Sequence, residues 1–251
     1  MDKARVATTA KTAQEAKRLV VIGNRILACE GILDSYGHVS MRNPENPTAF
    51  FQSRSLSPER VTIGDILEID FEGNVITQTN NSPYYERFIH SEIYRVREDV
   101  QAIVHNHALP IIALSVAEIP IQVVFHMGGI FYDGVPYYDA YDVSNGTLAI
   151  TQEEGKRIAR CLGKNRACVM RGHGAVVTGE GMSRCVLGAI SLRDNCLVQM
   201  QALSLSTNIH PLSKELAYRA GQLALSENSL RRSWDYFVTR AQKAMPDIVD
   251  L

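Results

Sequence analysis

The chain has 251 residues, with 26 Lys and Arg against 27 Asp and Glu, so its formal net charge is -1 when histidine is neutral. Acidic and basic residues are interspersed along the whole chain, which argues against a nucleic-acid or membrane-surface partner, because such proteins usually carry a clustered basic excess. A hydrophobic share of 45% and a charged share of 21% exclude disorder as the dominant state and predict a globular protein with a large core.

The first half of the chain has the pattern of a helix followed by an antiparallel meander. Apolar residues at helical spacing predict a long helix over 11–34, interrupted near Gly23 and Gly31. The segment Glu72-Gly73-Asn74 has the composition of a hairpin turn between two β-rich segments, so a further strand is expected after it. Strand-like runs are predicted at 38–42, 50–53 and 66–70.

In the second half, helices and strands alternate without an internal repeat. Helices are predicted at 85–97, 152–161 and 183–203, with two more in the tail over 213–244. Strands are predicted at 102–108, 119–125, 135–139 and in both halves of 167–179, on either side of a tight turn. We therefore expect a single α/β domain over 1–251, with a central, largely antiparallel sheet and the helices of 213–244 appended.

The cysteines and the N-terminal segment indicate the cellular compartment in which we expect the protein. Five cysteines without CxxC spacing lie in apolar or helix-like stretches, as is typical of buried thiols in a reducing cytosol. The charges near the N-terminus lie too close together for a signal peptide, and no run reaches the ~18 apolar residues of a spanning helix. We expect a soluble, cytoplasmic protein.

Three histidines form the pattern of a divalent metal site. His105 and His107 lie two apart in a predicted strand, so both imidazoles project from one side. His173 lies between Gly172 and Gly174, which leave room for a turn and for close approach of a ligand. Three imidazoles with an open coordination position favour a catalytic metal site. The alternative for the histidine pair is ordinary half-buried polar residues.

Glu86 and His90 lie four apart at the start of a predicted helix and therefore share one side of it. The alternative is an acid that complements the helix dipole beside a surface histidine.

The motifs GHVSMR, ERFIHSEIYRVREDVQAIVHNHA and VMRGHGAVVTG occur in this order. With this spacing, the sequence resembles the class II aldolase/adducin family over about residues 15–205. The resemblance implies a mainly antiparallel, nine-stranded sheet flanked by helices. It also implies a homo-oligomer, usually a tetramer with its sites at subunit interfaces. The family's metal ligands would fall on His105, His107 and His173, and its catalytic acid/base on Glu86.

The sequence departs from the sugar-phosphate aldolases of that family at the positions that serve the substrate phosphate. His38 replaces an asparagine, and Tyr84 and Tyr85 replace two serines. The small hydrogen-bond donors that could bind the phosphate of a ketose are therefore absent from these positions. Aromatic rings suit a flat substrate, and the segment Ser53-Arg54-Ser55 offers a guanidinium for a carboxylate. The alternatives are packing for the tyrosines and a solvated loop position for Arg54. His126 is a weak further candidate for substrate contact.

These departures are similar to a branch of the family that decarboxylates hydroxylated aromatic or dienoic acids. We therefore expect a carbon–carbon lyase, a metal-dependent decarboxylase of a hydroxylated aromatic or enol-bearing carboxylic acid in aromatic-compound catabolism. Loss of CO2 leaves charge that delocalises as an enolate or phenolate, which a divalent cation stabilises. Glu86 or His38 would supply the proton to the carbanion.

Three questions stay open at this level. The alternative activities are a metal-dependent aldolase acting on a non-phosphorylated hydroxy-carbonyl substrate and a non-enzymatic, adducin-like binding module. The metal is Mn²⁺ or Zn²⁺, with Fe²⁺ or Co²⁺ as further options, since three imidazoles suit all four. The partner is a small carboxylic acid rather than nucleic acid or membrane, and its identity depends on pocket side chains that the motifs do not specify.

Overall fold

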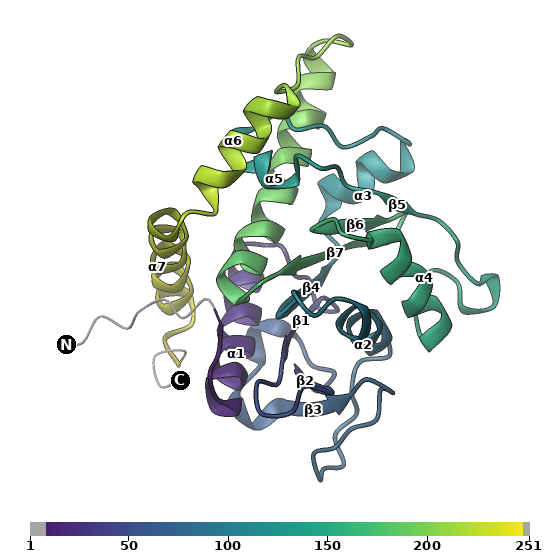
Figure 1. The fold of residues 1–251 in the computed structure, drawn as a ribbon, viewed down its shortest axis with the longest axis vertical. Coiled ribbons are helices and arrows are strands. Elements are labelled where there is room, and N and C mark those ends of the chain that lie inside the picture. Colours follow the sequence, from purple (N-terminus) through teal and green to yellow (C-terminus); the bar gives the residue numbers. More distant parts are fainter. Residues whose placement is uncertain (1–8, 248–251) are drawn as a thin grey trace.

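The computed structural model describes residues 9–247 as a single α/β domain built on one sheet (Figure 1). Residues 1–8 and 248–251 of the expected domain lie outside the described residues. The strands are β1 (His38–Arg42), β2 (Ala49–Ser53), β3 (Ile66–Asp70), β4 (Ala102–Asn106), β5 (Tyr137–Tyr138), β6 (Ala167–Met170) and β7 (Gly174–Gly179). Their spatial order is β3-β2-β1-β4-β7-β6-β5, and every neighbouring pair is antiparallel except β5 with β6.

Helices cover both faces of the sheet. They are α1 (Ala13–Cys29), α2 (Arg87–Val96), α3 (Leu109–Val116), α4 (Gln152–Leu162), α5 (Met182–Leu205), α6 (Lys214–Ala224) and α7 (Glu227–Ala244). Four short 3-10 helices are η1 (Pro58–Arg60), η2 (Ile63–Asp65), η3 (His126–Phe131) and η4 (Val143–Asn145). The expected α/β class is confirmed. None of the helices within residues 9–247 is both long and apolar enough to cross a membrane.

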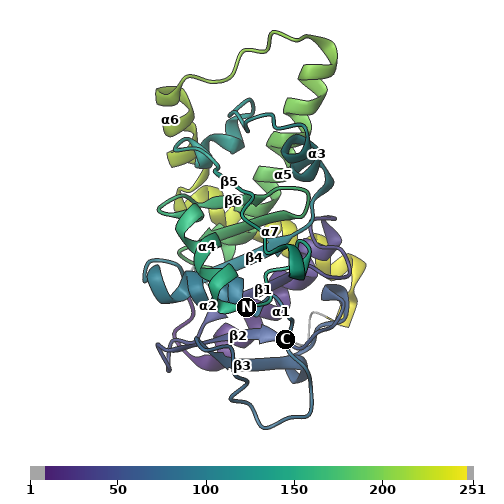
Figure 2. The same ribbon diagram turned by 90° about the vertical axis from the view of Figure 1, so that its right-hand side faces the viewer.

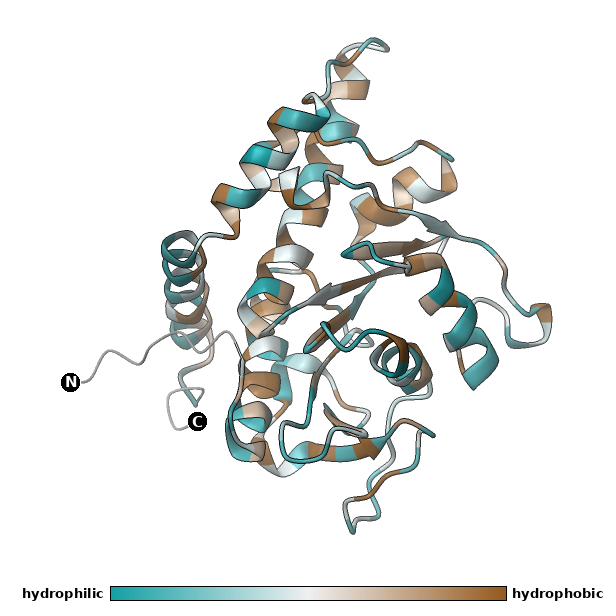
Figure 3. Cartoon of the chain, viewed as in Figure 1, coloured by the Kyte–Doolittle hydropathy of each residue, from teal (hydrophilic) through white to brown (hydrophobic). Residues whose placement is uncertain are grey.

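The alternation of side chains along each strand divides the core into two parts. Ala102 and Val104 of β4 pack with residues of α1 and α5 on one face. Ile103 packs with residues of α2 and α4 on the other face. Figure 3 shows the strands predominantly brown, whereas the outer surfaces of α4 and α7 are largely teal. His105, two residues after Ile103, therefore lies on the α2 and α4 side.

The sheet has seven strands within the described residues rather than the nine that the resemblance implied. Two expected strands are missing from it. After the turn at Gly73, the chain makes a single bridge, from Val75 to Ile69 of β3, and no ladder. The segment 119–125 is extended, but its backbone groups bond to side chains of α5 instead of to a neighbouring strand.

The amide of Asn195 on α5 substitutes for that strand. Its Oδ1 accepts the N–H groups of Val124 and Phe125, and its Nδ2 donates to the carbonyl of Gln122. We expect Asn195→Ala to lower the free energy of unfolding by about 2–3 kcal/mol, because partly buried backbone groups lose their partners. Urea unfolding measures this, with the exposed amide of Gln201 on the same helix, changed to Ala, as the control. Equal stability of both variants would contradict this role of Asn195.

Two helix predictions need correction. The first helix continues through Gly23, where a side chain would collide with Met182, and it ends at Cys29 before the left-handed Gly31. The predicted break at Gly23 was therefore wrong and the one near Gly31 was right. Helix α3 was not predicted, because the segment LPIIALSV is apolar on all sides and shows no helical period.

The tail forms two helices, as expected. Helix α7 lies beside α1, where Arg240 pairs with Glu30 at 2.6 Å. Figure 2 shows the segment between α5 and α6 crossing over one end of the molecule. This tail extends the α1 and α5 side of the molecule, on the face opposite to α2 and α4.

Candidate metal centre and substrate cavity

Three imidazoles converge at the end of β4. The Nε2 atoms of His105 and His107 lie 3.1 Å apart, and each lies 3.2 Å from Nε2 of His173. Together with a carboxylate oxygen of Glu86, these ligand atoms all lie within 4.8 Å of one another. Within residues 9–247 this is the one group of three or more such side chains close enough to hold a metal ion.

The turn between β6 and β7 brings His173 to His105 on β4 and to His107, which follows this strand. Gly172 has a φ of +69°, a left-handed conformation that favours glycine. At Gly174, a Cβ would lie 2.1 Å from the carbonyl oxygen of Asn106, so only glycine lets β7 approach β4 here. Both glycines serve the backbone, as expected for the turn. The space at Gly174, however, is filled by β4 and not by a ligand.

The second ring nitrogen of each histidine faces a hydrogen-bond acceptor. His105 Nδ1 lies 3.2 Å from the carbonyl of Ala175, and His173 Nδ1 lies 2.7 Å from the carbonyl of Thr147. His107 Nδ1 lies 3.0 Å from Asp34 Oδ1. These acceptors place the ring proton on Nδ1 and turn the Nε2 lone pair of each imidazole toward the others.

Glu86 completes the cluster from the start of α2. It occupies the N-cap position, and its Oε1 accepts the N–H of Ala149 at 3.0 Å. Its Oε2 lies 3.4 Å from Nε2 of His105 and 3.6 Å from Nε2 of His173. Burial opposes ionisation of this carboxyl, but positive charge on His105 and His173 outweighs burial and holds the pKa of Glu86 below its usual range, and a divalent cation between the rings would act in the same direction. Glu86 is therefore a carboxylate.

This donor set fits a divalent cation. Three lone pairs that face one another repel unless a cation lies between them. Nitrogen ligands at ~2.1 Å from a tetrahedral zinc lie ~3.4 Å apart, close to the observed spacing. Burial and the neighbouring His105 lower the pKa of His107 to about 4, so this ring is neutral at pH 7. At His173, Glu86 outweighs burial and raises the pKa, so a proton competes with a metal there at low pH.

Asp34 orients His107 from outside the cluster. The same carboxylate accepts the N–H groups of Tyr36 and Gly37. Asp34→Asn keeps an acceptor for those groups but removes the negative charge beside Nδ1 of His107, so we expect metal affinity to fall about 10–100-fold. Competition with a chromogenic chelator measures this, with the exposed Asp133→Asn as the control. Unchanged affinity in Asp34→Asn would remove Asp34 from the metal centre.

A cavity of about 570 Å³ opens beside the metal centre. Glu86, His107 and His173 form its base, and His38 lies in its wall with Tyr84, at 4.3 Å between ring centroids. Burial lowers the pKa of His38 well below its usual value, so this imidazole is neutral. None of the described residues that line the cavity is Lys or Arg. The other lining residues are Ser35, Tyr36, Ser55, Leu56, Ser57, Tyr85 and Leu148.

The expected substrate contacts divide into those that reach this cavity and those that do not. Tyr84 is buried and its hydroxyl bonds to the carbonyl of Leu56, whereas Tyr85 is 77% exposed. Both tyrosines line the cavity. Ser55 is the member of the Ser53-Arg54-Ser55 segment that also lines it, while Ser53 is buried beneath.

Arg54 and His126 lie outside the described lining. The Arg54 guanidinium pairs with Asp65 at 2.7 Å, so it would have to leave this carboxylate to bind a substrate. His126 is exposed at the start of η3. Sequence reasoning selected Arg54 for its charge, which the tertiary structure has already neutralised.

Comparisons with known proteins show the family of this chain. A sequence profile described as "Class II Aldolase and Adducin N-terminal domain" matches residues 9–200. The chain belongs to the class II aldolase and adducin family. The sequence resemblance is thereby confirmed. Proteins similar to this chain include decarboxylases and an aldolase, which are lyases.

Two similar curated proteins of this family are decarboxylases by name. Decarboxylase tropJ of Talaromyces stipitatus is 29% identical, over 90% of this chain and 93% of that protein. The 3,4-dihydroxyphthalate decarboxylase of Arthrobacter keyseri is 27% identical, over 75% of this chain and 79% of that protein. In fold, the L-fuculose 1-phosphate aldolase of Glaciozyma antarctica matches with a TM-score of 0.79, at 23% identity, over 95% and 94% of the two chains.

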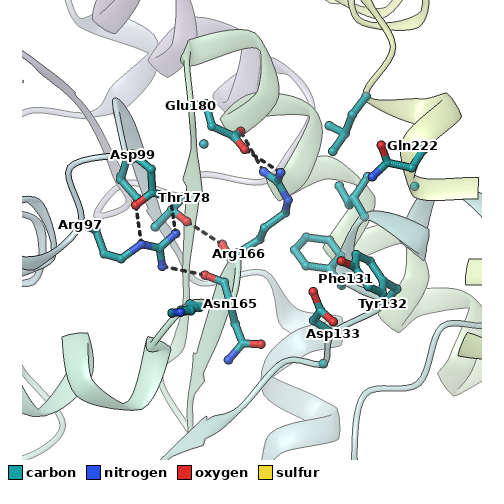
Figure 4. A pocket seen from close by; sticks show the side chains of 17 residues that line it. Arg97, Asp99, Phe131, Tyr132, Asp133, Asn165, Arg166, Thr178, Glu180 and Gln222 are labelled. Atoms are coloured by element: carbon teal, nitrogen blue, oxygen red, sulfur yellow. Dashed lines mark hydrogen bonds and ion pairs between the residues drawn. The ribbon is translucent and has the colours of Figure 1, made fainter. Parts of the chain in front are cut away.

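Another hollow, of about 190 Å³, lies at the opposite end of β6 and β7 from His173 (Figure 4). Both of its guanidinium groups are already paired. Arg97 forms two hydrogen bonds with Asp99, and Arg166 forms two with Glu180. Lys164 also lines the hollow, but the cluster of side chains that could hold a metal ion within residues 9–247 lies elsewhere. The cavity at the metal centre is therefore the better candidate for the active site of this family member.

Sequence reasoning missed Asp34 and the segment around Thr147 and Leu148. Asp34 has a local signal, because an Asp three residues before a glycine can cap the turn that leads into GHVS. Thr147 contributes a backbone carbonyl, which any residue could supply. No side-chain pattern therefore marks that position.

Proposed function

We propose that this chain is a metal-dependent decarboxylase of a hydroxylated aromatic or enol-bearing carboxylic acid, acting in aromatic-compound catabolism. The observation that carries this proposal is the cavity beside the metal centre. Its described wall combines aromatic and apolar side chains with neutral hydroxyls, and it offers no cationic side chain to a phosphate. The similarity to two proteins named as decarboxylases supports the same choice.

The residues of the cavity have different roles in the proposed reaction. A divalent cation bound by the three imidazoles would act as a Lewis acid toward negative charge that develops on the substrate. The Glu86 carboxylate accepts the proton of the substrate hydroxyl. The bond to the carboxylate then breaks, CO2 leaves, and its bonding electrons stay on the ring or diene carbon. Glu86 returns the proton to that carbon, so atoms and charge balance.

The cavity wall orients the substrate for this step. Tyr84 and His38 present ring faces and edges against which a planar acid can lie. The hydroxyls of Ser55 and Ser57 suit its polar substituents. We extend the proposal to a homotetramer with sites at subunit interfaces, to Mn²⁺ or Zn²⁺ as the metal, and to the cytoplasm as the compartment.

The test is CO2 release from a panel of ortho-hydroxy aromatic acids and 2-hydroxy-dienoic acids by the manganese-loaded protein. We expect release from at least one acid, and its loss in His105→Ala. A folded, metal-loaded protein that releases no CO2 from any acid of the panel would contradict the proposal.

A carbon–carbon lyase of the aldolase type is the second candidate. The hydroxyls of Ser35, Ser55 and Ser57 in the cavity favour it, since they can bind a non-phosphorylated hydroxy-carbonyl substrate. Like the decarboxylase, it would leave negative charge on carbon that a divalent cation would stabilise, and it differs in the fragment that leaves. Aldehyde formation without CO2 would identify it. A protein that folds normally and binds no metal would instead favour an adducin-like binding module.

A further inference from the structure

A buried chain of hydrogen bonds joins α2 to the wall of the cavity. The Tyr94 hydroxyl lies 2.8 Å from Ser40 Oγ, and Ser40 Oγ lies 2.6 Å from His90 Nδ1. His90 Nε2 lies 2.9 Å from His38 Nδ1. All four side chains are at most 1% exposed. Because they lie away from bulk water, each of their hydrogens needs a partner inside the protein.

The strand register explains how this chain of hydrogen bonds forms. Ser40 lies opposite Ile103 of β4, and His38 lies opposite His105, so both face the α2 side of the sheet. His90 and Tyr94 lie one helical turn apart on α2, and their side chains contact Ser40 and His38 on this face of the sheet. One end of the chain is therefore a phenol in the core, and the other is an imidazole in the cavity wall.

The phenol determines the direction of the hydrogen bonds. Burial raises the pKa of Tyr94, so its proton stays on the oxygen, and Ser40 is its hydrogen-bond partner within residues 9–247. Tyr94 donates to Ser40, so Ser40 donates to Nδ1 of His90. His90 then carries its proton on Nε2 and donates to His38. The opposite direction would leave the Tyr94 O–H buried without an acceptor.

Gln52 adds a second donor at the same nitrogen of His38. Its Nε2 lies 3.2 Å from His38 Nδ1 and donates to it. With two N–H groups directed at it, Nδ1 is an acceptor, and the ring proton of His38 is on Nε2. We propose that this chain of hydrogen bonds holds His38 as a neutral imidazole whose Nε2–H is a hydrogen-bond donor to the substrate. Tyr94, Ser40 and His90 act through His38 and are positioning residues.

The orientation of the chain separates the roles of His38 and Glu86. If His38 gave up its Nε2 proton, each hydrogen of the chain would shift one place toward the cavity, and Tyr94 would become a buried phenolate. The chain therefore cannot replace the proton, and His38 supplies a hydrogen bond rather than a proton. This assignment of the proton to Glu86 rests on the proposed function, whereas the tautomer of His38 does not.

The first measurement is the tautomer of His38 in the zinc-loaded protein labelled with [15N]histidine. Long-range 1H–15N correlation spectra distinguish a protonated from an unprotonated ring nitrogen, and His38→Gln assigns the signal by its disappearance. We expect protonation at Nε2, the opposite of the Nδ1 protonation expected for His105, His107 and His173. Protonation of His38 at Nδ1, or at both nitrogens, at pH 7 would overturn the inference. This test needs no substrate.

A matched pair at His90 tests the positioning role. In His90→Gln, the amide can still donate to His38 Nδ1, so we expect the wild-type tautomer and a kcat within about threefold of wild type. In His90→Leu this donor is absent, and Gln52, whose buried Oε1 has no hydrogen-bond partner, can turn that oxygen toward Nδ1. We therefore expect Nδ1 protonation of His38 to appear and kcat to fall about tenfold at similar KM. Wild-type spectra from His90→Leu would remove His90 from the chain. Should neither variant fold, the wild-type spectrum decides by itself.

A second pair, at His38, separates hydrogen bonding from proton transfer. His38→Gln keeps an N–H donor without an acidic proton, and we expect kcat within about tenfold of wild type. His38→Leu removes the donor, and we expect kcat to fall about 100-fold. Equal, large losses in both variants would make His38 the proton source and overturn the assignment. Absence of any decarboxylation in the wild type would count against the proposed function, while the spectra would still test the tautomer.

Discussion

Replacing Glu86 with glutamine is expected to lower turnover about 100-fold or more while the protein keeps its metal. Glutamine has nearly the same shape, and its amide oxygen can still accept the N–H of Ala149. It cannot take a proton from the substrate hydroxyl and return it to carbon, which is the contribution of a general acid/base. The three imidazoles remain to hold the cation.

Steady-state CO2 release and metal analysis of the same preparation measure this effect. Glu153→Gln is the matched control, because Glu153 is exposed on α4 and pairs with Arg160 far from the cavity. Unchanged turnover in Glu86→Gln would remove Glu86 from proton transfer. Loss of the metal from this variant would instead place Glu86 among the ligands.

Removal of the metal is expected to abolish turnover and to lower the melting temperature. A ligand present at about 1,000 times its Kd stabilises the folded state by about 4 kcal/mol, which for a chain of this size corresponds to ~8–16 °C. The effect should be large because the Nε2 atoms of His105, His107 and His173 face one another, so the empty cluster retains unfavourable contacts between lone pairs.

Thermal unfolding with and without chelator measures this shift, followed by readdition of Zn²⁺ or Mn²⁺. His105→Ala should show no metal-dependent shift. The control is His126→Ala, because His126 is exposed and lies outside the cluster, and this variant should respond to metal as the wild type does. A shift of wild-type size in His105→Ala would exclude His105 as a ligand.

Much of the fold follows from local patterns. The periods of apolar residues predicted α2, α4 and α5 closely, and the short apolar runs predicted β1, β3 and β7. Local patterns failed for 119–125, where an apolar run suggested a buried strand. There the backbone partners come from Asn195 and Gln199, more than 70 residues away, and no local signal reveals them.

In the candidate site, too, some features follow from local spacing and others depend on residues distant in the sequence. The spacing of His105 and His107 predicted that their imidazoles project from one side, and their Nε2 atoms do lie 3.1 Å apart. The predicted strand was too long, however, because β4 ends at Asn106 and His107 follows it. The roles of Arg54 and His38 were not predictable in this way. Whether Arg54 has a free charge depends on its ion pair with Asp65. The tautomer of His38 depends on the chain of hydrogen bonds that ends at Tyr94.

The sequence by itself determined the family, the helix and strand periods, and the three histidines with Glu86, because these depend on residue type and short-range spacing. The tertiary structure decided how they work together. The register of β1 against β4 places His38 beside His105, and the approach of α2 brings His90 onto His38. Such pairings are selected by the packing of the whole core, so residues that are distant in the chain acquire their charge states and proton positions only in the folded protein.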